Sequence, residues 1–110
     1  MTKADSVLIE YFGDNPVVRI TDFLIENKLF DYSKKQIMEE SGLSKATLFK
    51  YFGRLERVGI VKATRRFGKT TLYKINEENP VVRKIIALGL ELANQEALQL
   101  SKHVVIKAVK

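Results

Sequence analysis

The sequence contains no cysteine, no tryptophan, one histidine and two prolines among 110 residues. Without cysteine, the chain can form neither a disulfide nor a thiolate metal site, which agrees with a reducing compartment. Charged residues interrupt the apolar runs well before the roughly 20 residues that a membrane helix needs. The first residues also lack an apolar run of signal-peptide length. We therefore expect a soluble, cytoplasmic protein without a membrane partner.

Groups arranged for catalysis are also missing from the sequence. No acidic pair is placed with a nucleophile, and Glu39-Glu40 and Glu77-Glu78 are typical of solvated or helix-end charge. No glycine motif that cradles phosphate is present. The single histidine, His103, is typical of a surface cation near a helix end rather than of a metal ligand or a base. We expect no enzyme activity, no cofactor and no metal site.

Basic residues are concentrated in the middle of the chain, whose net charge is +6. Residues 1–32 hold three Lys or Arg against six Asp or Glu, and residues 33–75 hold eleven against three. The remaining residues, 76–110, hold five against four. Scattered lysines that served only solubility would be spread evenly. The asymmetry favours a polyanionic partner, most often a nucleic acid.

The string NPVVR occurs twice, at residues 15–19 and 79–83. The sequences that flank the two copies differ, so the chain is not a duplicated domain. Each copy predicts a helix start, because Asn is a preferred N-cap and Pro tolerates the first helical position. One helix should run from Pro16 to near Asn27, followed by an extended connector. Residues 7–12 are apolar but too few to distinguish a strand from a helical turn.

The next two helices are separated by a turn that contains glycine. Ser33 and Gln36 form a capping box at the start of one helix, and Gly42 ends it. Ser44 caps the following helix, which extends to Val58. Two helices joined by such a turn predict a helix-turn-helix.

The second of these helices, residues 45–58, has one apolar and one basic face. At 100° per residue Leu48, Phe52 and Leu55 fall in one narrow sector. Thr47, Lys50, Arg54 and Arg57 lie together on the opposite side. We expect the first face to pack on the domain and the second to face a phosphate-lined groove. Phe49 and Tyr51 border the polar face, where packing at the edge of the core is favoured over base contact.

Two runs rich in β-formers surround Phe67-Gly68-Lys69 and predict a hairpin. Its buried face should consist of Val61, Ala63, Tyr73 and Ile75, and its exposed tip of Arg65, Arg66, Lys69 and Thr70. A helix-turn-helix followed by a hairpin with a basic tip is a winged helix. The fold class is therefore mainly α with a small β-hairpin, in which residues 1–79 form the winged-helix DNA-binding domain with its N-terminal segment.

Residues 80–110 should form a long C-terminal helix that belongs to the same domain. Its apolar residues fall into two stripes, one of which has coiled-coil-like spacing. We expect this stripe to form a homodimer interface through Ile86, Leu90, Ala93, Ala97 and Leu100. The second stripe contains Val81, Ile85, Leu88 and Leu92. Which of the two faces the partner subunit stays open.

Residues 11–84 resemble, nearly end to end, the winged-helix transcriptional regulators of archaea and bacteria, especially small archaeal ones. Within this range, the stretch SKATLFKYFGRLERVGIV matches their recognition helix where it runs into the wing. The resemblance implies that Thr47, Lys50 and Arg54 face a DNA groove and that Arg65, Arg66 and Lys69 belong to the wing. Gly53 departs from a strong helix former, at a cost of about 1 kcal/mol relative to Ala.

Together these observations predict a sequence-specific regulator that binds double-stranded DNA, with the wing at residues 65–70 on the backbone or minor groove. The expected DNA-contacting residues are Ser44, Lys45, Thr47, Lys50, Tyr51, Arg54, Arg57, Arg65, Arg66, Lys69 and Thr70. One alternative is a winged helix that binds proteins, with the basic face incidental. Binding to RNA or single strands ranks lowest, because most aromatic residues fall on predicted core positions.

Overall fold

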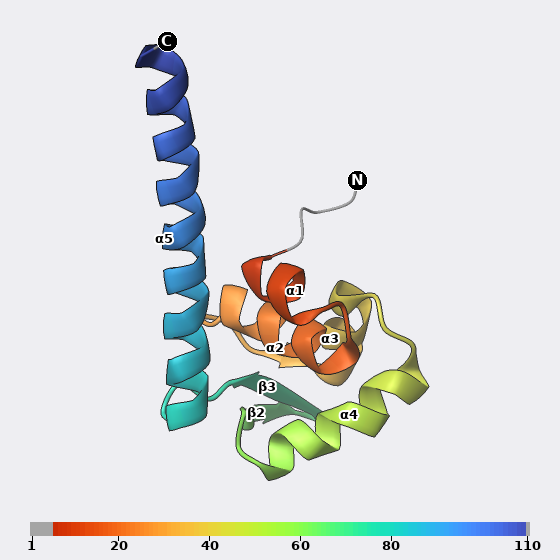
Figure 1. Cartoon of the computed structure of the whole chain (residues 1–110). Coiled ribbons are helices and arrows are strands. Elements are labelled where there is room, and N and C mark those ends of the chain that lie inside the picture. Colours follow the sequence, from red (N-terminus) through yellow and green to blue (C-terminus); the bar gives the residue numbers. More distant parts are fainter. Residues whose placement is uncertain (1–5, 110) are drawn as a thin grey trace.

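The computed structural model describes residues 6–109, with side chains up to residue 102, so that the prediction for His103 lies outside the described side chains. In this part of the chain, helices α1 to α4 and a small sheet form a body from which the long helix α5 extends as a rod (Figure 1). The molecule measures 63 × 31 × 21 Å along its principal axes. Much of α5 therefore projects beyond the body (Figure 1).

Both copies of NPVVR begin helices as predicted. Asn15 caps α2 (Pro16–Glu26), and its side-chain oxygen accepts a hydrogen bond from the Val18 N–H at 3.0 Å. Asn79 does the same for α5 (Pro80–Val109), accepting from the Val81 N–H at 2.8 Å. Residues 7–12, which the sequence left open, form the helix α1 (Val7–Phe12).

The helix-turn-helix consists of α3 (Lys34–Ser41) and α4 (Lys45–Arg57). Its capping box is confirmed, since the Gln36 N–H donates to Ser33 Oγ at 3.1 Å and the Ser33 N–H donates to Gln36 Oε1 at 2.8 Å. Gly42 ends α3 in the left-handed conformation, with a φ of 65°. The capping box and Gly42 therefore set the two ends of α3 through local interactions.

The core lies between α2, α4 and the sheet. Leu48, Phe52 and Leu55, which form the predicted apolar face of α4, are buried. The Phe52 ring packs edge-on against the Tyr73 ring, with 4.8 Å between the ring centres. Ile20 from α2 belongs to the same cluster. Burial of a large aromatic side chain such as Phe52 contributes on the order of 2 to 3 kcal/mol. The core therefore fixes the rotation of α4 about its axis.

The sheet has three antiparallel strands in the order β1-β3-β2, rather than a hairpin alone. Strands β2 (Val61–Phe67) and β3 (Thr70–Ile75) form the predicted hairpin. Strand β1 (Tyr32–Ser33) consists of the last two residues of the predicted connector. It pairs with β3 through Tyr73 and Leu72, so the segment between α2 and α3 is attached to the wing.

The prediction that Ala63 is buried is wrong, although its register opposite Tyr73 places it on the face of the hairpin that packs on the core. Val61, Tyr73 and Ile75 are buried as expected, but Ala63 is exposed. The register passes from Ala63 opposite Tyr73 directly to Arg65 opposite Leu72, so Thr64 lies in a bulge and has no opposite residue in the register of β3. A bulge bends the strand and shifts the following side chains to the other face. The wing beyond it therefore no longer covers the core.

Helix α5 docks on the body along a line that lies between the two predicted apolar stripes. Val82, which belongs to neither stripe, is fully buried, and Ile85 and Ile86 are half-buried. Further along, α5 meets α1 at Gly89, where a Cβ atom would lie 3.9 Å from the Leu8 side chain. Within residues 6–109, no helix is long and apolar enough to cross a membrane.

Two glycines of the helix-turn-helix should respond in opposite ways to alanine. Gly53 lies inside α4, and a Cβ atom there would meet nothing within 4 Å. Gly53→Ala should therefore raise the free energy of unfolding by about 1 kcal/mol, measured by urea denaturation. Gly42→Ala, the control, should lower it by about 1 to 2 kcal/mol, because its φ of 65° is unfavourable for alanine. Destabilisation by both changes would contradict a regular α4.

Candidate nucleic-acid interface

The exposed face of α4 carries a row of basic side chains. Burial of Leu48, Phe52 and Leu55 on one side of the helix directs residues on the other side to solvent. Lys50, Arg54 and Arg57 are all exposed there, as the sequence predicts, and Lys45 is exposed in the first turn of the helix. The amphipathic pattern therefore gives this helix a buried face and a cationic face.

The first turn of α4 is ordered by its cap. Ser44 Oγ accepts a hydrogen bond from the Thr47 N–H at 3.1 Å and donates one to Thr47 Oγ1 at 2.8 Å. Ser44 and Thr47, both predicted to contact DNA, are therefore hydrogen-bonded to each other. An anion at this end of α4 would still meet the positive end of the helix dipole.

The two aromatic residues beside the basic face behave differently. Tyr51 is half-buried against the core, and the charged groups of Lys50 and Arg54 lie 5.5 and 5.7 Å from its ring centre. Tyr51 thus supports both cations by cation–π contact.

Phe49 is 51% exposed, so the prediction that it packs at the edge of the core is wrong. It lies between Lys45 and Lys34, whose ammonium groups are 5.9 and 5.1 Å from its ring centre. The i, i+4 spacing of Lys45 and Phe49 brings such a pair together on a helix. This spacing could have predicted the contact between Lys45 and Phe49, but the apolar character of Phe49 favoured a position at the edge of the core.

Ion pairing divides the basic residues into two groups. Arg19, Lys28, Lys62 and Arg65 each pair with a carboxylate. Among residues 6–102, by contrast, no carboxylate pairs with any cation of α4. The positive charge on α4 is therefore available to an external anion, whereas charge elsewhere is partly neutralised within the chain.

Arg65, predicted to contact DNA from the wing, forms an ion pair with Asp31 of the body. Its Nε and Nη2 groups donate to the two carboxylate oxygens of Asp31 at 2.9 and 3.1 Å. Thr64 Oγ1, at the bulge, donates to the same carboxylate at 2.6 Å. Asp31 thus fastens the base of the wing to the segment before β1. Sequence reasoning missed Asp31, which lies 34 residues from Arg65.

The tip of the wing carries the remaining predicted residues. Arg66, Lys69 and Thr70 are exposed, and the Arg66 Nε donates to the Gly68 carbonyl at 3.1 Å. No carboxylate of the described residues pairs with Arg66 or Lys69. These two cations are therefore available to an external anion, whereas the charge of Arg65 is paired with Asp31.

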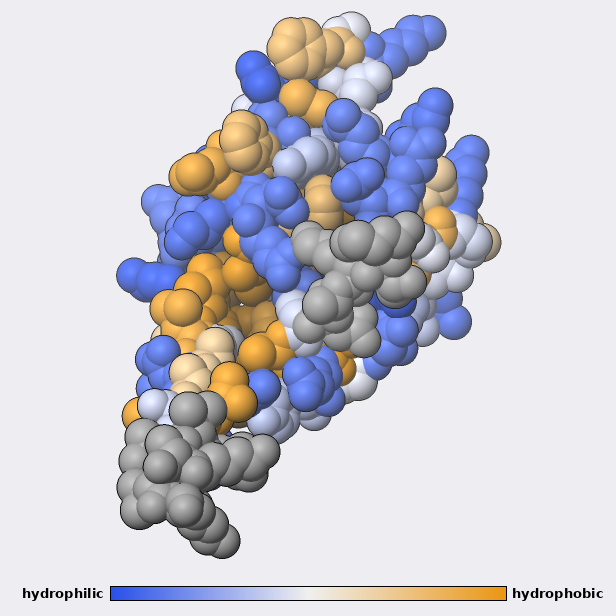
Figure 2. Space-filling model, turned by 90° about the horizontal axis from the view of Figure 1, so that it is seen from above, coloured by the Kyte–Doolittle hydropathy of each residue, from blue (hydrophilic) through white to orange (hydrophobic). Residues whose placement is uncertain are grey.

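The α5 face predicted to form a dimer interface is exposed for most of its length. Leu90 and Leu100 are 63% and 66% exposed, and Ala93 and Ala97 are also exposed. Ile86 is the exception, because α5 docks on the core through it. Seen from above, apolar side chains gather in a band with a hollow at its middle, on the side of the molecule that carries α1 and α5 (Figure 2).

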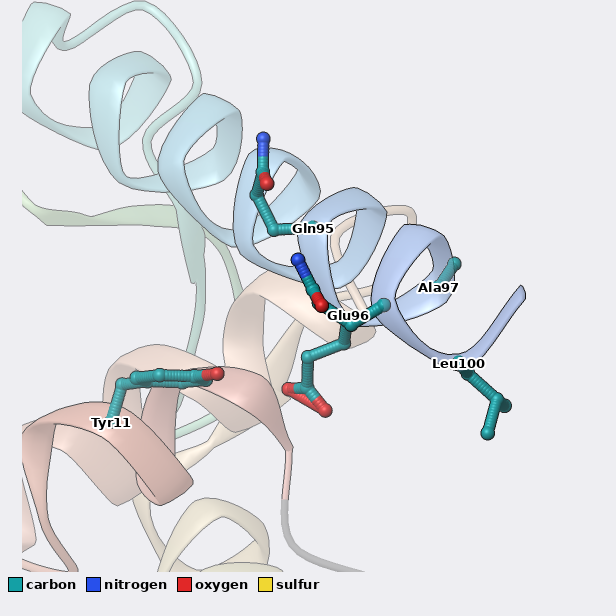
Figure 3. Close-up of a pocket in the computed structure, with 6 residues that line it drawn as sticks. Tyr11, Gln95, Glu96, Ala97 and Leu100 are labelled. Atoms are coloured by element: carbon teal, nitrogen blue, oxygen red, sulfur yellow. The ribbon is translucent and has the colours of Figure 1, made fainter. Parts of the chain in front are cut away.

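A cleft of about 590 Å³ separates α1 from the second half of α5. Glu96 reaches from α5 towards Tyr11 of α1, while Leu100 lies at the far end (Figure 3). The Oε1 atom of Glu96 is buried without a hydrogen-bond partner among the described residues. Buried polar atoms usually have a hydrogen-bond partner, so Glu96 Oε1 lacks an expected hydrogen bond in the isolated chain.

Comparison with known proteins identifies the fold. The sequence matches no family model, and no curated protein gives a significant match. Solved structures do match. The Rv0081 protein of Mycobacterium tuberculosis is 29% identical with a TM-score of 0.55, and the match covers 86% of this chain and 90% of that one.

Two further structures are similar to this chain. ZitR of Lactococcus lactis in complex with DNA has 17% identity and a TM-score of 0.52, covering 99% of this chain and 77% of that one. The homodimeric winged helix-turn-helix DNA-binding domain of Mb0332 from Mycobacterium bovis, a possible ArsR-family transcriptional regulator, has 19% identity and a TM-score of 0.53, covering 86% and 92%. The chain therefore has the winged helix-turn-helix fold. These three structures come from bacteria, so the resemblance to archaeal proteins stays a prediction.

The attachment of the wing through Asp31 should depend on pH. Hydrogen bonds from Arg65 and then from Thr64 hold the pKa of Asp31 below its ordinary value of 3.8. Because the folded-state pKa is lowered, this contribution to stability is present above about pH 4 and is lost as the pH falls through the folded pKa. Asp31→Asn should therefore lower the urea midpoint at pH 7, and the difference from the unmodified protein should vanish in acid.

Hydrogen exchange locates the same effect within the molecule. In Asp31→Asn, amides of β2 and β3 near the bulge should exchange several-fold faster, while α4 keeps its protection. Asp14→Asn is the matched control, because Asp14 pairs with Arg19 on α2 and has a pKa lowered in the same way. Equal acceleration of wing exchange in both variants would contradict the anchoring role of Asp31.

Proposed function

We propose that the chain is a sequence-specific, double-stranded DNA-binding transcriptional regulator. The observation that carries this proposal is the cationic face of α4, which is exposed and free of carboxylate partners within the described residues. A major groove admits one α-helix and displays both phosphates and base edges. The winged fold, shared with a protein solved in complex with DNA, supports the same function.

The residues of α4 take different roles in this proposal. Lys50 and Arg54, supported by the Tyr51 ring, reach base edges, where Arg binds the O6 and N7 atoms of guanine. Lys45 and Arg57, at the two ends of the helix, contact phosphates and fix its register. Ser44 and Thr47 offer hydroxyls at the positive end of the helix. At the wing, Arg66, Lys69 and Thr70 contact the backbone or the minor groove.

We also propose that two copies associate through α5. Exposed leucines on a long helix that projects beyond the body are costly in water, and burial of each contributes on the order of 2 kcal/mol. The unsatisfied Glu96 oxygen beside this face also favours burial against a partner that supplies a donor. A two-fold dimer would place the two α4 helices in successive major grooves, about 34 Å apart.

A second candidate function is a protein-binding module, and the exposed leucines of α5 favour it. The two functions are distinguished by selection of duplexes from a random pool. A regulator enriches an imperfect palindrome with half-sites about ten base pairs apart. Failure to retard any duplex would reject DNA binding and leave the protein-binding alternative. We propose that the regulator acts in the cytoplasm.

Replacement of Arg54 and of Arg66 should affect DNA binding differently. Arg54→Ala should reduce the preference for selected over random duplex by about 1 to 3 kcal/mol, because it removes a base contact. Arg66→Ala should weaken binding to both duplexes alike, because phosphates are the same in every sequence. Fluorescence anisotropy measures both affinities. Arg83→Ala removes an exposed arginine from α5 and should change neither; unchanged discrimination in Arg54→Ala would contradict the groove assignment.

Charges placed on the exposed face of α5 should separate the dimer. The double variant Leu90→Glu and Leu100→Glu should sediment as a monomer, because burial of the two carboxylates would cost more than the apolar contact contributes. Gln95→Glu is the control, since Gln95 lies five residues from each leucine and thus about 140° around the helix. A dimer that survives the double change would mean that the subunits associate elsewhere.

A further inference from the structure

A basic pocket of about 390 Å³ lies between the first turn of α3 and the tip of the wing. Its lining includes Lys34 and Lys35 from α3, Lys69 and Thr70 from the tip, and Thr71 and Tyr73 from β3. Three lysines and two threonines therefore line one space, and no carboxylate belongs to its lining. Neither Lys34 nor Lys35 belongs to the residues that sequence patterns assign to DNA binding.

Aromatic rings hold Lys34 in place at the back of this pocket. Its ammonium group lies 5.1, 5.3 and 5.5 Å from the ring centres of Phe49, Phe52 and Tyr73. Phe52 and Tyr73 belong to the core, so the rings form a rigid support. Cation–π contact attracts an ammonium group to the ring faces but leaves its charge in place. Lys34 is thus ordered while its positive charge stays without a counter-charge.

The three lysines lack the carboxylate partners that neighbouring lysines have. Lys62 pairs with Glu78 at 3.4 Å and Lys28 with Glu77 at 3.8 Å. Within residues 6–102, Lys34, Lys35 and Lys69 form no ion pair. Like charges gathered in one pocket repel one another, and the positive end of α3 adds to their field. A tetrahedral oxyanion would relieve this repulsion and accept hydrogen bonds from all sides.

The position of the pocket indicates where the oxyanion comes from. Phe49 contacts both Lys34 of the pocket and Lys45 in the first turn of α4. Lys69 and Thr70 connect the pocket to the wing. The pocket therefore lies between the two elements that the proposed function places against DNA. A duplex that touches both must carry its backbone past the pocket.

We infer that Lys34, Lys35 and Lys69 form a binding pocket for one backbone phosphate of the DNA duplex, with the hydroxyl of Thr71, on the same side of β3 as Tyr73, as a further donor. This inference rests on the proposed function. The pocket joins α3 to the wing through the phosphate and sets the depth of α4 in the groove. Because a phosphate carries no sequence information, the pocket strengthens binding to every duplex alike.

The test uses the double variant Lys35→Gln and Lys69→Gln, which keeps Lys34 on its rings and so keeps the core intact. The plot of log affinity against log salt concentration should become shallower by about 0.9 for each phosphate that the variant no longer neutralises. Selected and random duplexes should lose affinity by the same factor. The matched control is Lys62→Gln and Lys74→Gln, two lysines that face each other across β2 and β3 outside the pocket. It removes the same charge and should keep the slope.

Neutral methylphosphonate linkages, introduced one at a time, identify the phosphate itself. One linkage in each half-site should weaken binding by the unmodified protein and leave the double variant unaffected. If the variant keeps both the salt slope and the full methylphosphonate pattern, the pocket assignment is overturned while the proposed function stands. If the unmodified protein binds no duplex, the proposed function fails, and the pocket assignment fails with it.

A separate arm examines phosphate that is not part of DNA. Inorganic phosphate and adenosine monophosphate are titrated into the unmodified protein while the backbone amide signals of Lys35 and Thr70 are followed by NMR. Weak shifts that appear only above millimolar concentrations are expected for a site that a duplex occupies. Saturation of these signals at micromolar concentrations of either compound would overturn the assignment to DNA and indicate a site for a free phosphate compound.

Discussion

Burial of one side of α4 is the constraint on which the rest of the molecule depends. Leu48 and Phe52 are fully buried, and Leu55 nearly so, which fixes the helix in rotation as well as in position. Since residues of a helix follow one another at 100°, the same contacts direct Lys50 and Arg54 outward. Replacement of one large core side chain by alanine costs about 3 to 5 kcal/mol. The core therefore positions the basic face more firmly than contacts among exposed side chains could.

A second anchor fixes the wing relative to this core. Val61, Tyr73 and Ile75 hold the base of the hairpin in the core, and polar contacts hold the strand at the bulge beyond it. Asp31 supplies them by accepting hydrogen bonds from Thr64 and Arg65. The bulge at Thr64 makes this possible, because it moves Arg65 to the face that Asp31 approaches. An arginine that the sequence pattern assigns to binding thus also has a structural role, whereas Arg66 and Lys69 have no carboxylate partner among the described residues.

Features set by neighbouring residues could be predicted from the sequence, whereas features set by distant residues could not. The capping box of Ser33 and Gln36 involves contacts within a few residues, so the motif itself specifies the geometry. The Asp31–Arg65 pair depends on how the chain folds back on itself, which no local pattern records. Helix α5 likewise shows two apolar stripes in its sequence, but the body determines where the helix docks, and Val82 is buried on the line between them.

The distribution of ion pairs connects stability with binding. Carboxylates neutralise Arg19, Lys28, Lys62 and Arg65 on the body, whereas the cations of α4 and of the basic pocket have no carboxylate partner among the described residues. Their mutual repulsion opposes folding of the isolated chain, and solvent and salt screen it only in part. A polyanion removes this repulsion on binding. In the proposed complex with DNA, the free energy that the uncompensated charges cost the free protein would be recovered, which would make affinity strongly dependent on ionic strength.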